Sequence, residues 1–335
     1  MTIRPTVKRK RGSLVLVFAT ALAIASVHVA AQAPYPNKPI RIIVPYPPGA
    51  GTDFTGRELG AIFAKALGQA VVIDNRGGAA ATIGHALGAK AAPDGYTLLL
   101  GTTGGLVSGP ALMGARIPYD PLNDFATIGL ATYVPYAIAV TASLPANTIK
   151  ELIDLARAQP RKLNVASPGV GTPNHIGAAQ LMTLTGIEIV HVPYKGSALA
   201  INDVIAGNVQ LIVTGLLQLL PLHQAGRVRI LGVGHQERIK AYPDIPTIAE
   251  TVPGYYNTGW WGIVAPAHTP KAIVDKLNAI MSRELKTPEV SQRFEKNGLQ
   301  VATSTPRGFH DMIVSDLQMW KKLIKDAKIS VEVLP

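Results

Sequence analysis

The chain has 335 residues, of which 47% are hydrophobic and 16% are charged, and its formal net charge is +11 at pH 7. It contains no cysteine, which excludes disulfides, thiolate catalysis and cysteine-based metal sites. The basic residues are scattered and are not interleaved with aromatic side chains. The charge therefore predicts a solvated surface and no nucleic-acid partner.

The first segment of the chain has the pattern of an export signal. Four consecutive basic residues, Lys8 to Arg11, precede an uncharged stretch from Ser13 to Ala31 that ends in small residues. We predict a signal peptide over residues 1–31, cleaved near Ala31, and a periplasmic location for the mature protein. An uncleaved membrane anchor is the alternative interpretation. Removal of the signal takes away five of the 32 basic residues and leaves a net charge of +6.

Behind the signal, short apolar runs alternate with amphipathic helical runs, which is typical of an α/β protein with helices on both faces of its sheet. About 300 mature residues exceed what one hydrophobic core usually supports, so two lobes are expected. We place the first lobe at 32–132 and 258–335, and the second lobe at 133–257. The predicted strands are 40–44, 70–74, 96–100, 136–141, 163–166, 189–191, 209–213, 228–233 and 261–264.

Several helix starts carry recognisable capping signals. Thr148 is followed three residues later by Glu151, which predicts a capping box. At three further places a threonine precedes proline, which predicts a capping threonine and proline as the first helical residue. These places are Thr172-Pro173, Thr269-Pro270 and Thr305-Pro306.

The first strand runs into a loop rich in proline and glycine, which we call the first loop, residues 46–53. Its prolines cannot donate hydrogen bonds, so free backbone N–H groups are concentrated from Gly49 to Asp53. With the positive end of the following helix they predict an anion site, and a carboxylate is the first ligand to consider. Asp53 is predicted to cap a helix beginning near Phe54, with contact to a ligand ammonium as the alternative. The candidate ligand contacts in this loop are Tyr46, Pro48, Gly49, Ala50, Gly51, Thr52 and Asp53.

A second loop of the same kind, residues 167–175, follows the predicted strand 163–166. Ser167 and Thr172 offer hydroxyl groups, and Gly169 and Gly171 offer exposed N–H groups. His175 falls in the first helical turn and either contacts the ligand or packs. All five residues are candidate ligand contacts, and the two loops are predicted to form two halves of one cleft.

Further candidates lie where ligands bind in open α/β sheets, on loops that follow strands. They are Thr102, Thr103 and Tyr194. In the pair Trp260-Trp261, a strand position allows one indole to pack while the other faces the cleft, and Trp261 is the candidate.

The familiar catalytic and metal-binding motifs are absent from the sequence. There is no Gly-x-Ser-x-Gly elbow, no phosphate loop, no His-Glu-x-x-His and no complete Gly-x-Gly-x-x-Gly. The histidines have no metal-ligand spacing, so neither a metal nor a cofactor is predicted. Ser167 and His175, with Asp53, can form a nucleophilic set only if the loops face each other.

Several segments together resemble the Bug family, the periplasmic solute receptors of tripartite tricarboxylate transporters. The resemblance implies a two-lobe periplasmic-binding-protein fold, type II-like, that closes on a small carboxylate-bearing solute. It also implies that the two loops hold one carboxylate through backbone N–H groups and ordered waters. The matching segments, in chain order, are 45–53, 74–78, 94–98, 167–175, 192–196 and 243–247.

Two segments depart from the family pattern. The first loop has Gly49-Ala50 where a Gly-Gly pair is usual, and the usually glycine-rich segment after Asn75-Arg76 is here 77–82, with three alanines. Both changes restrict backbone conformation near the ligand, which bears on fine specificity and not on binding itself.

We therefore predict a periplasmic, monomeric receptor that performs no chemistry. It captures a small organic carboxylate by lobe closure and delivers it to membrane transporter subunits. Two alternatives come from other classes: a periplasmic hydrolase that uses Ser167 and His175, and a ligand-sensing subunit for a signalling kinase.

Overall fold

The computed structural model describes residues 1–2, 35–49 and 51–326, apart from the side chain of residue 80. The chain divides into two units, Met1–Asn37 and Lys38–Pro335, and the second unit contains the folded structure considered below. In the first unit the Tyr35–Pro36 peptide bond is cis. Most of the predicted signal peptide, and Ala50 of the first loop, lie outside the described residues. Within the described ranges, every helix is too short or too polar to cross a membrane.

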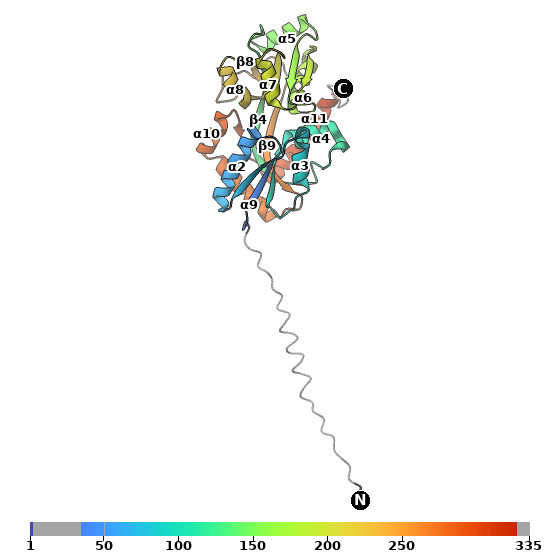
Figure 1. The fold of residues 1–335 in the computed structure, drawn as a ribbon, viewed down its shortest axis with the longest axis vertical. Helices are drawn as coiled ribbons and strands as arrows, with labels where there is room; N and C mark the ends of the chain where they lie inside the picture. Colours follow the sequence, from blue (N-terminus) through green and yellow to red (C-terminus); the bar gives the residue numbers. More distant parts are fainter. Residues whose placement is uncertain (3–34, 50, 327–335) are drawn as a thin grey trace. The chain divides into compact units, whose positions relative to one another are not determined.

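The second unit alternates strands and helices, as the sequence predicts (Figure 1). The strands are β1 (Ile40–Val44), β2 (Val71–Asn75), β3 (Thr97–Thr102), β4 (Phe125–Thr141), β5 (Asn164–Ser167), β6 (Val190–Pro193), β7 (Leu211–Gly215), β8 (Val228–Val233), β9 (Thr258–Pro266) and β10 (Gln300–Val301). The α-helices are α2 (Gly51–Leu67), α3 (Thr82–Ala89), α4 (Gly109–Met113), α5 (Ile149–Ala158), α6 (Pro173–Thr185), α7 (Ser197–Ile205), α8 (Leu216–Gln224), α9 (Lys271–Leu285), α10 (Pro288–Lys296) and α11 (Pro306–Asp326). Short helical turns are η1 (Ala79–Ala81), the π-helix η2 (Gly104–Ser108), η3 (Gly114–Arg116) and η4 (Ile248–Glu250).

Strand β4 belongs to two sheets and joins them. Its residues from Phe125 to Pro135 pair with β9 in the first sheet, whose order is β2-β1-β3-β9-β4, with β10 beside β4. Its residues from Tyr136 to Thr141 pair with β7 and β8 in the second sheet, and β5 and β6 follow β7. In Figure 1, α5, α7 and α8 surround the second sheet, α2, α3 and α9 surround the first, and β4 and β9 run between the two groups.

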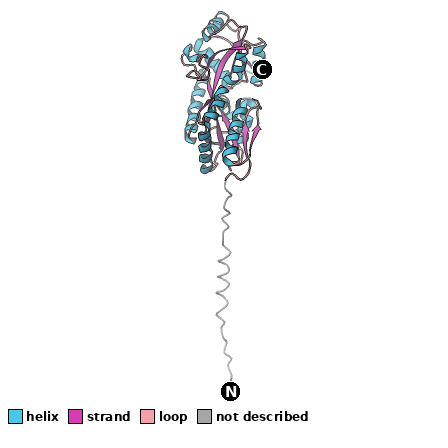
Figure 2. Ribbon diagram, turned by 90° about the vertical axis from the view of Figure 1, so that its left-hand side faces the viewer, coloured by secondary structure: helices cyan, strands magenta, loops and turns pink. Residues whose placement is uncertain are grey.

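The parallel strands determine where the loops meet. β1, β2 and β3 are parallel in the first sheet, and β5, β6 and β7 are parallel in the second, while β4 and β9 run antiparallel to their neighbours. The carboxyl ends of parallel strands lie at one edge of a sheet, and each of β1 and β5 ends there in one of the two Pro/Gly loops. Figure 2 shows helices packed beside both sets of strands, which confirms the predicted α/β fold class.

The hydrophobic core is divided in the same way as the sheets. One cluster of buried residues, which includes Ile43, Leu99, Trp260 and Phe309, fills the region of the first sheet. Two further clusters cover the two faces of the second sheet, one against α5 and α6 and the other against α7 and α8. Helices thus cover both faces of the second sheet, as is usual where parallel strands are buried on both sides.

The predicted strand boundaries were partly wrong. The interval 136–141 is only the second part of β4, because its first part contains Thr127, Gly129 and Pro135 and so has no continuous apolar run. This first part is nevertheless a strand, because it pairs with β9. Strand β9 is itself longer than the predicted 261–264. The two-residue strand β10 was not predicted.

The capping signals were mostly correct. Thr148 and Thr172 cap α5 and α6, and the Thr305 hydroxyl accepts a hydrogen bond from the N–H of Gly308 in α11. The predicted capping box at Thr148 is only half formed, because the Glu151 carboxylate accepts from the Asn147 N–H instead. The expectation for Thr269 was wrong, because its hydroxyl bonds to the Pro266 carbonyl and α9 begins one residue after Pro270. Proline there precedes the helix instead of starting it.

Candidate functional site

The first loop is organised around the carboxylate of Asp53. Helix α2 begins at Gly51, earlier than the predicted start near Phe54, so Asp53 lies in its first turn instead of at its cap. Its Oδ2 accepts from the Gly49 N–H at 3.1 Å and from Arg57 Nε at 3.0 Å, and its Oδ1 accepts from Asn75 Nδ2 at 3.1 Å. Burial pulls the pKa of Asp53 upward, but these bonds hold it below its usual value. The ionised carboxylate therefore closes the loop, and the Gly49 N–H is already occupied.

The donors that remain in the first loop come from the start of α2. Helix geometry leaves the first N–H groups, those of Gly51, Thr52 and Asp53, without an acceptor inside the helix. The Thr52 hydroxyl is also buried and has no partner among the residues described. Gly49 has φ of 83°, a conformation that favours glycine and turns the chain into the helix.

The segment behind the first loop is strained. Ala79 and Ala81 have φ values of 46° and 78°, in the left-handed region where a side chain costs about 1–2 kcal/mol. They are two of the three alanines in the segment 77–82. The segment supports the loop, since a Cβ added at Gly77 would lie 2.9 Å from Pro47. The Asn75 side chain also donates to the Tyr46 carbonyl at 3.0 Å.

The side chains at the end of β3 are already hydrogen bonded. The Tyr46 hydroxyl bonds to Thr102, and burial raises the pKa of Tyr46 although this bond acts in the opposite direction. The Thr103 hydroxyl accepts from the Trp260 N–H at 2.7 Å and donates to the Trp260 carbonyl at 3.2 Å. These residues therefore tie β3 to the first loop and to β9.

Both side chains of the tryptophan pair are buried, and they contact different elements. Trp260 is 1% exposed, and its indole donates to Asp316 and packs edge-on against Phe309. The Trp261 ring lies against the start of α2, where a Cβ added at Gly51 would be 2.8 Å from it.

In the second loop, two of the predicted donors are used internally. The Gly171 N–H donates to His175 Nδ1 at 3.2 Å, and the Gly169 N–H donates to Ser167 Oγ at 3.3 Å. Thr172 accepts from the His175 N–H as the helix cap and donates to the Gly169 carbonyl at 2.7 Å. The expectation that the glycine N–H groups face the ligand is therefore wrong for Gly169 and Gly171 in this structure.

His175 is left with one donor of its own. A nitrogen that accepts a hydrogen bond carries no proton, so the neutral ring of His175 is protonated at Nε2. Burial lowers the pKa of His175 to about 4, which keeps the ring neutral at pH 7. The ring can then donate one hydrogen bond without carrying charge.

Ser167 pairs with a histidine that the sequence analysis did not select. Ser167 Oγ lies 2.6 Å from His191 Nε2, whereas the predicted partner His175 bonds to Gly171. The rings of His175 and His191 are stacked, with centroids 3.9 Å apart. In the parallel pairing of β5 with β6, Val165 lies opposite His191 and Ser167 opposite Pro193. Because residues two apart on a strand share a face, this register places His191 on the same face of the sheet as Ser167, and the sequence alone does not give the register.

Tyr194, directly after β6, supports the second loop. Its N–H donates to the Ser167 carbonyl at 2.9 Å, and its hydroxyl donates to Asp203 Oδ2 on α7 at 2.5 Å. Burial, and then the bond to Asp203, raise the pKa of Tyr194 to about 12.

The two loops contact side chains that come from the opposite sheet. A Cβ added at Gly51 in the first loop would lie 2.9 Å from Leu217 Cδ2 on α8, which follows β7 of the second sheet. A Cβ added at Gly171 in the second loop would lie 2.5 Å from Leu112 Cδ2 on α4, which follows β3 of the first sheet. Both loops thus lie where the two sheets approach each other.

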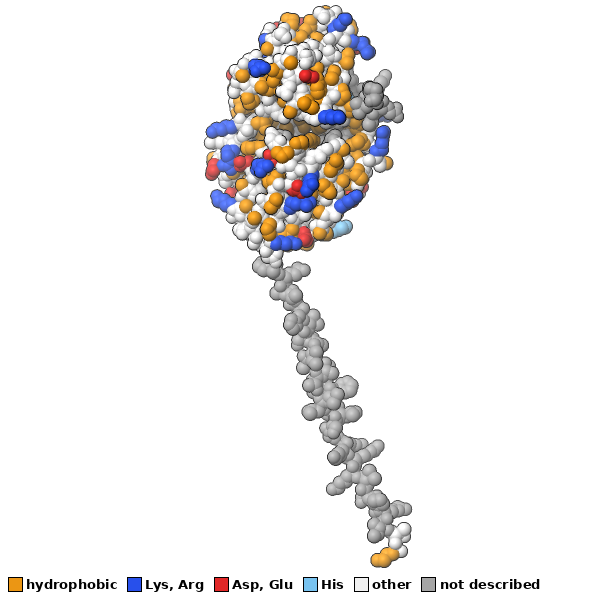
Figure 3. All heavy atoms as spheres, viewed as in Figure 1, with side chains coloured by type: hydrophobic (Ala, Val, Ile, Leu, Met, Phe, Trp, Pro, Cys, Tyr) orange, Lys and Arg blue, Asp and Glu red, His pale blue; other side chains and the backbone are white. Residues whose placement is uncertain are grey.

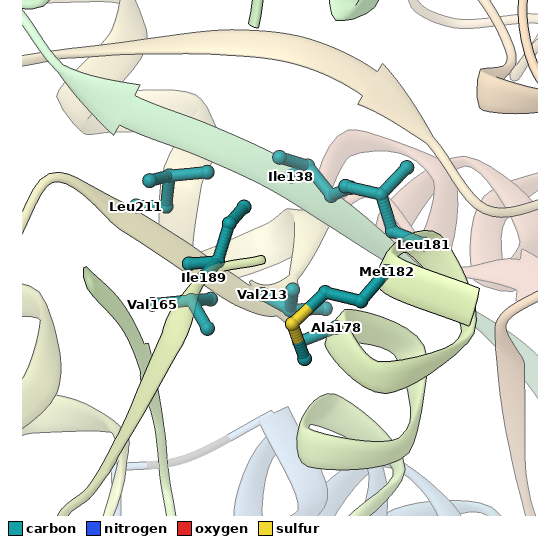
Figure 4. A pocket seen from close by; sticks show the side chains of 8 residues that line it. All are labelled: Ile138, Val165, Ala178, Leu181, Met182, Ile189, Leu211 and Val213. Atoms are coloured by element: carbon teal, nitrogen blue, oxygen red, sulfur yellow. The ribbon is translucent and has the colours of Figure 1, made fainter. Parts of the chain in front are cut away.

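Two cavities lie elsewhere in the molecule. One is a void of about 10 Å³ between α6 and the second sheet, lined by eight apolar side chains (Figure 4). The other, of about 390 Å³, lies beside β8 and the start of α5 and is lined in part by His223 and Asp244. Neither is lined by residues of the two loops.

Apart from Asp53, the acidic side chains and the lysines and arginines of the described residues are at least partly exposed. On the face drawn in Figure 3, Lys and Arg side chains are scattered and form no continuous stripe. Asp53 is the one acidic or basic side chain other than histidine among the buried polar residues of the described ranges. The same ranges contain no group of three His, Cys, Asp or Glu residues placed to hold a metal ion.

Comparison with known proteins identifies relatives along nearly the whole chain. Residues 56–329 match the model of the tripartite tricarboxylate transporter family receptor. The UPF0065 protein in the tcbD-tcbE intergenic region of Pseudomonas sp. strain P51 is 34% identical over 314 residues, 93% of each chain. Protein BugT of Bordetella pertussis is 32% identical over 294 residues, 87% of this chain and 90% of its own.

Solved structures give the same result. R. palustris Rpa4515 with adipate superposes with a TM-score of 0.84 at 33% identity, and covers 88% of this chain and 99% of its own. The periplasmic binding protein BugD gives 0.81 at 32% identity, with coverage of 88% and 99%. MatC from Rhodopseudomonas palustris with bound malate gives 0.78 at 29% identity, with coverage of 87% and 100%. These relatives are binding proteins, which agrees with the prediction of a receptor and not of a hydrolase. The chain therefore belongs to the tripartite tricarboxylate transporter receptor family, which includes the Bug proteins, and is a periplasmic solute-binding receptor.

Proposed function

We propose that this receptor captures a small organic carboxylate between the first and second loops and delivers it to the membrane subunits of a tripartite tricarboxylate-type transporter. One observation supports this most strongly. Helices α2 and α6 begin at the carboxyl ends of β1 and β5, in two loops that each contact a residue from the opposite sheet. A helix N-terminus favours an anion, and each of the two loops supplies one.

The carboxylate is held by neutral donors in this proposal. The N–H groups of Gly51, Thr52 and Asp53, the Thr52 hydroxyl and the His175 Nε2–H supply them. No lysine or arginine is buried among the described residues, so recognition relies on main-chain donors and helix dipoles. The adipate and malate named for two structural relatives support the choice of a carboxylate.

The remaining candidates have supporting roles in this proposal. Tyr46, Pro48 and Gly49 shape the first loop, and Trp261 bounds the ligand beside Gly51. Thr102 and Thr103 hold the first loop and β9 to β3. Gly169, Gly171 and Thr172 give the second loop its form, with Ser167 and Tyr194 at its base.

Closure follows from the two sheets in this proposal. The first lobe comprises 32–132 and 258–335 and the second comprises 133–257, so the chain passes to the second lobe within β4 and returns to the first at the start of β9. The signal is removed near Ala31, and the mature receptor acts as a monomer. Intact-mass analysis of the periplasmic fraction tests the cleavage, and full-length chain in the membrane fraction would indicate an anchor instead.

Thermal melting with matched solutes tests the ligand class. Adipate, its uncharged diamide and hexane-1,6-diamine share one carbon skeleton, and malate and benzoate extend the acids. We expect at least one acid to raise the melting temperature, with a gain of about 2.7 kcal/mol at a hundredfold excess over Kd. A rise with only the neutral or cationic solutes would refute the anion site. Loss of uptake of the bound acid on deletion of the receptor, restored by the parent chain, tests delivery.

A further inference from the structure

His191 lies between the two ends of the second loop. Its Nε2 is 2.6 Å from Ser167 Oγ, where the loop begins, and its ring stacks on His175, where the loop enters α6. The stacked rings are 3.9 Å apart and inclined by 11°. His191 itself belongs to strand β6, so it is held by a paired sheet and not by the loop that it contacts.

The three contacts of the Ser167 hydroxyl bear on which group donates to it. Ser167 Oγ has three contacts: the Gly169 N–H at 3.3 Å, the Gly169 carbonyl at 3.1 Å and His191 Nε2 at 2.6 Å. A carbonyl can only accept, so the contact with the Gly169 carbonyl is a hydrogen bond only when the single hydroxyl proton of Ser167 points to it. All three contacts are hydrogen bonds at once only if His191 Nε2 carries a proton and donates it to Ser167. A serine that accepts from histidine is not being activated as a nucleophile.

The stacking of His191 on His175 also restrains the end of the loop that enters α6. His175 Nδ1 accepts the Gly171 N–H, so the ring orientation of His175 determines where Gly171 lies. Burial lowers the pKa of His175 to about 4 and that of His191 to about 3, so two neutral rings face each other at pH 7. Stacking of neutral rings carries no charge repulsion.

We propose that His191 is a positioning residue, which holds the second loop in its ligand-binding form by donating to Ser167 and stacking on His175. This inference rests on the proposed carboxylate function for its effect on affinity. Its structural part concerns the ligand-free receptor and can be tested without any ligand. Binding groups held by a rigid element retain their geometry better than groups held only within a loop.

Nuclear magnetic resonance of the ligand-free receptor tests the restraint first. The ¹⁵N shifts of the ring nitrogens at pH 7 should report the Nε2–H tautomer for both His175 and His191. Amide exchange of Gly169 and Gly171 should accelerate at least tenfold in His191→Ala and remain near parental in His191→Gln, whose amide can still donate to Ser167. The control His223→Phe changes a half-buried histidine on α8 that contacts β8, and should leave both amides unchanged. An Nδ1–H tautomer at His191, or unchanged exchange in His191→Ala, would overturn the proposal.

Affinity for the acid with the largest melting shift tests the functional consequence. We expect His191→Phe, which keeps a ring but cannot donate, and Ser167→Ala each to weaken binding about tenfold. The double variant should be no weaker than the weaker single variant, because both remove one hydrogen bond. If the losses of affinity in the two single variants multiplied in the double variant, the two residues would not act through one hydrogen bond. If no acid binds the parent while the amide results hold, the proposed function fails and the positioning role stands.

Discussion

His85 on α3 is completely buried, and its environment predicts a measurable dependence of stability on pH. Its Nδ1 lies 2.9 Å from the Ala81 carbonyl, which can only accept, so Nδ1 carries the proton of the neutral ring. Nε2 is buried without a partner among the described residues, and the ring stacks on Tyr119 at 5.9 Å. A second proton at Nε2 would therefore be buried without an acceptor, and burial lowers the pKa of His85 from 6.5 to about 4.

The size of the effect follows from this pKa difference. Between pH 6.5 and about 4 the unfolded chain binds a proton at His85 and the folded chain does not, so acid favours unfolding. The contribution is complete above pH 6.5 and is lost as the pH falls to about 4, and its full size is about 3 kcal/mol. Between pH 7 and 5 the loss from His85 alone is about 2 kcal/mol. His175 and His191 act in the same direction, with pKa values of about 4 and about 3.

Urea unfolding at pH 7 and pH 5, followed by tryptophan fluorescence, measures this loss. His85→Phe keeps a ring and cannot titrate, so its free energy of unfolding should fall by about 2 kcal/mol less than that of the parent between the two pH values. Phe125→Leu, which alters a ring 6.4 Å from His85 but retains the titrating group, should keep the parental pH dependence. An identical fall in the parent and in His85→Phe would refute the assignment to His85.

Three further predictions concern the loops and the core. Gly51→Ala places a methyl group within 2.9 Å of Trp261 and Leu217 and should weaken acid binding by about 1–3 kcal/mol in calorimetric titration. The control Gly215→Ala has open space at its Cβ and should bind the acid within threefold of the parent. Gly171→Val would place a β-branched side chain at a φ of 77° and against Leu112, so it should reduce affinity more than Thr172→Ala, which loses a helix cap worth about 1 kcal/mol. A larger loss of affinity in Thr172→Ala would contradict the role assigned to the loop backbone. Val165→Ile adds one methylene beside the void in Figure 4 and should raise the free energy of unfolding by up to about 0.8 kcal/mol, while a loss of stability in urea titration would mean that the void cannot accept it.

Local signals in the sequence determined much of the architecture. The alternation of apolar runs and helical runs predicted the α/β class, and Thr148 and Thr172 marked helix starts because an N-cap bond spans only three residues. The two Pro/Gly loops were found for the same reason, since a strand, a turn and a helix start follow one another directly in the chain.

Tertiary structure decided the properties that depend on distant partners. The first part of β4 is a strand because β9 pairs with it, although its own pattern is broken by Gly129 and Pro135. The availability of loop N–H groups depends on side chains that fold back, since Asp53 occupies the Gly49 N–H and His175 occupies that of Gly171.

The partner of Ser167 shows the same limit most clearly. His191 is 24 residues away in sequence and reaches Ser167 through the parallel pairing of β5 with β6. A one-residue change of that register would turn the histidine to the other face of the sheet. Sequence determined which side chains and backbone donors the two loops contain, whereas strand register and side-chain hydrogen bonds determined which of them remain free for a ligand.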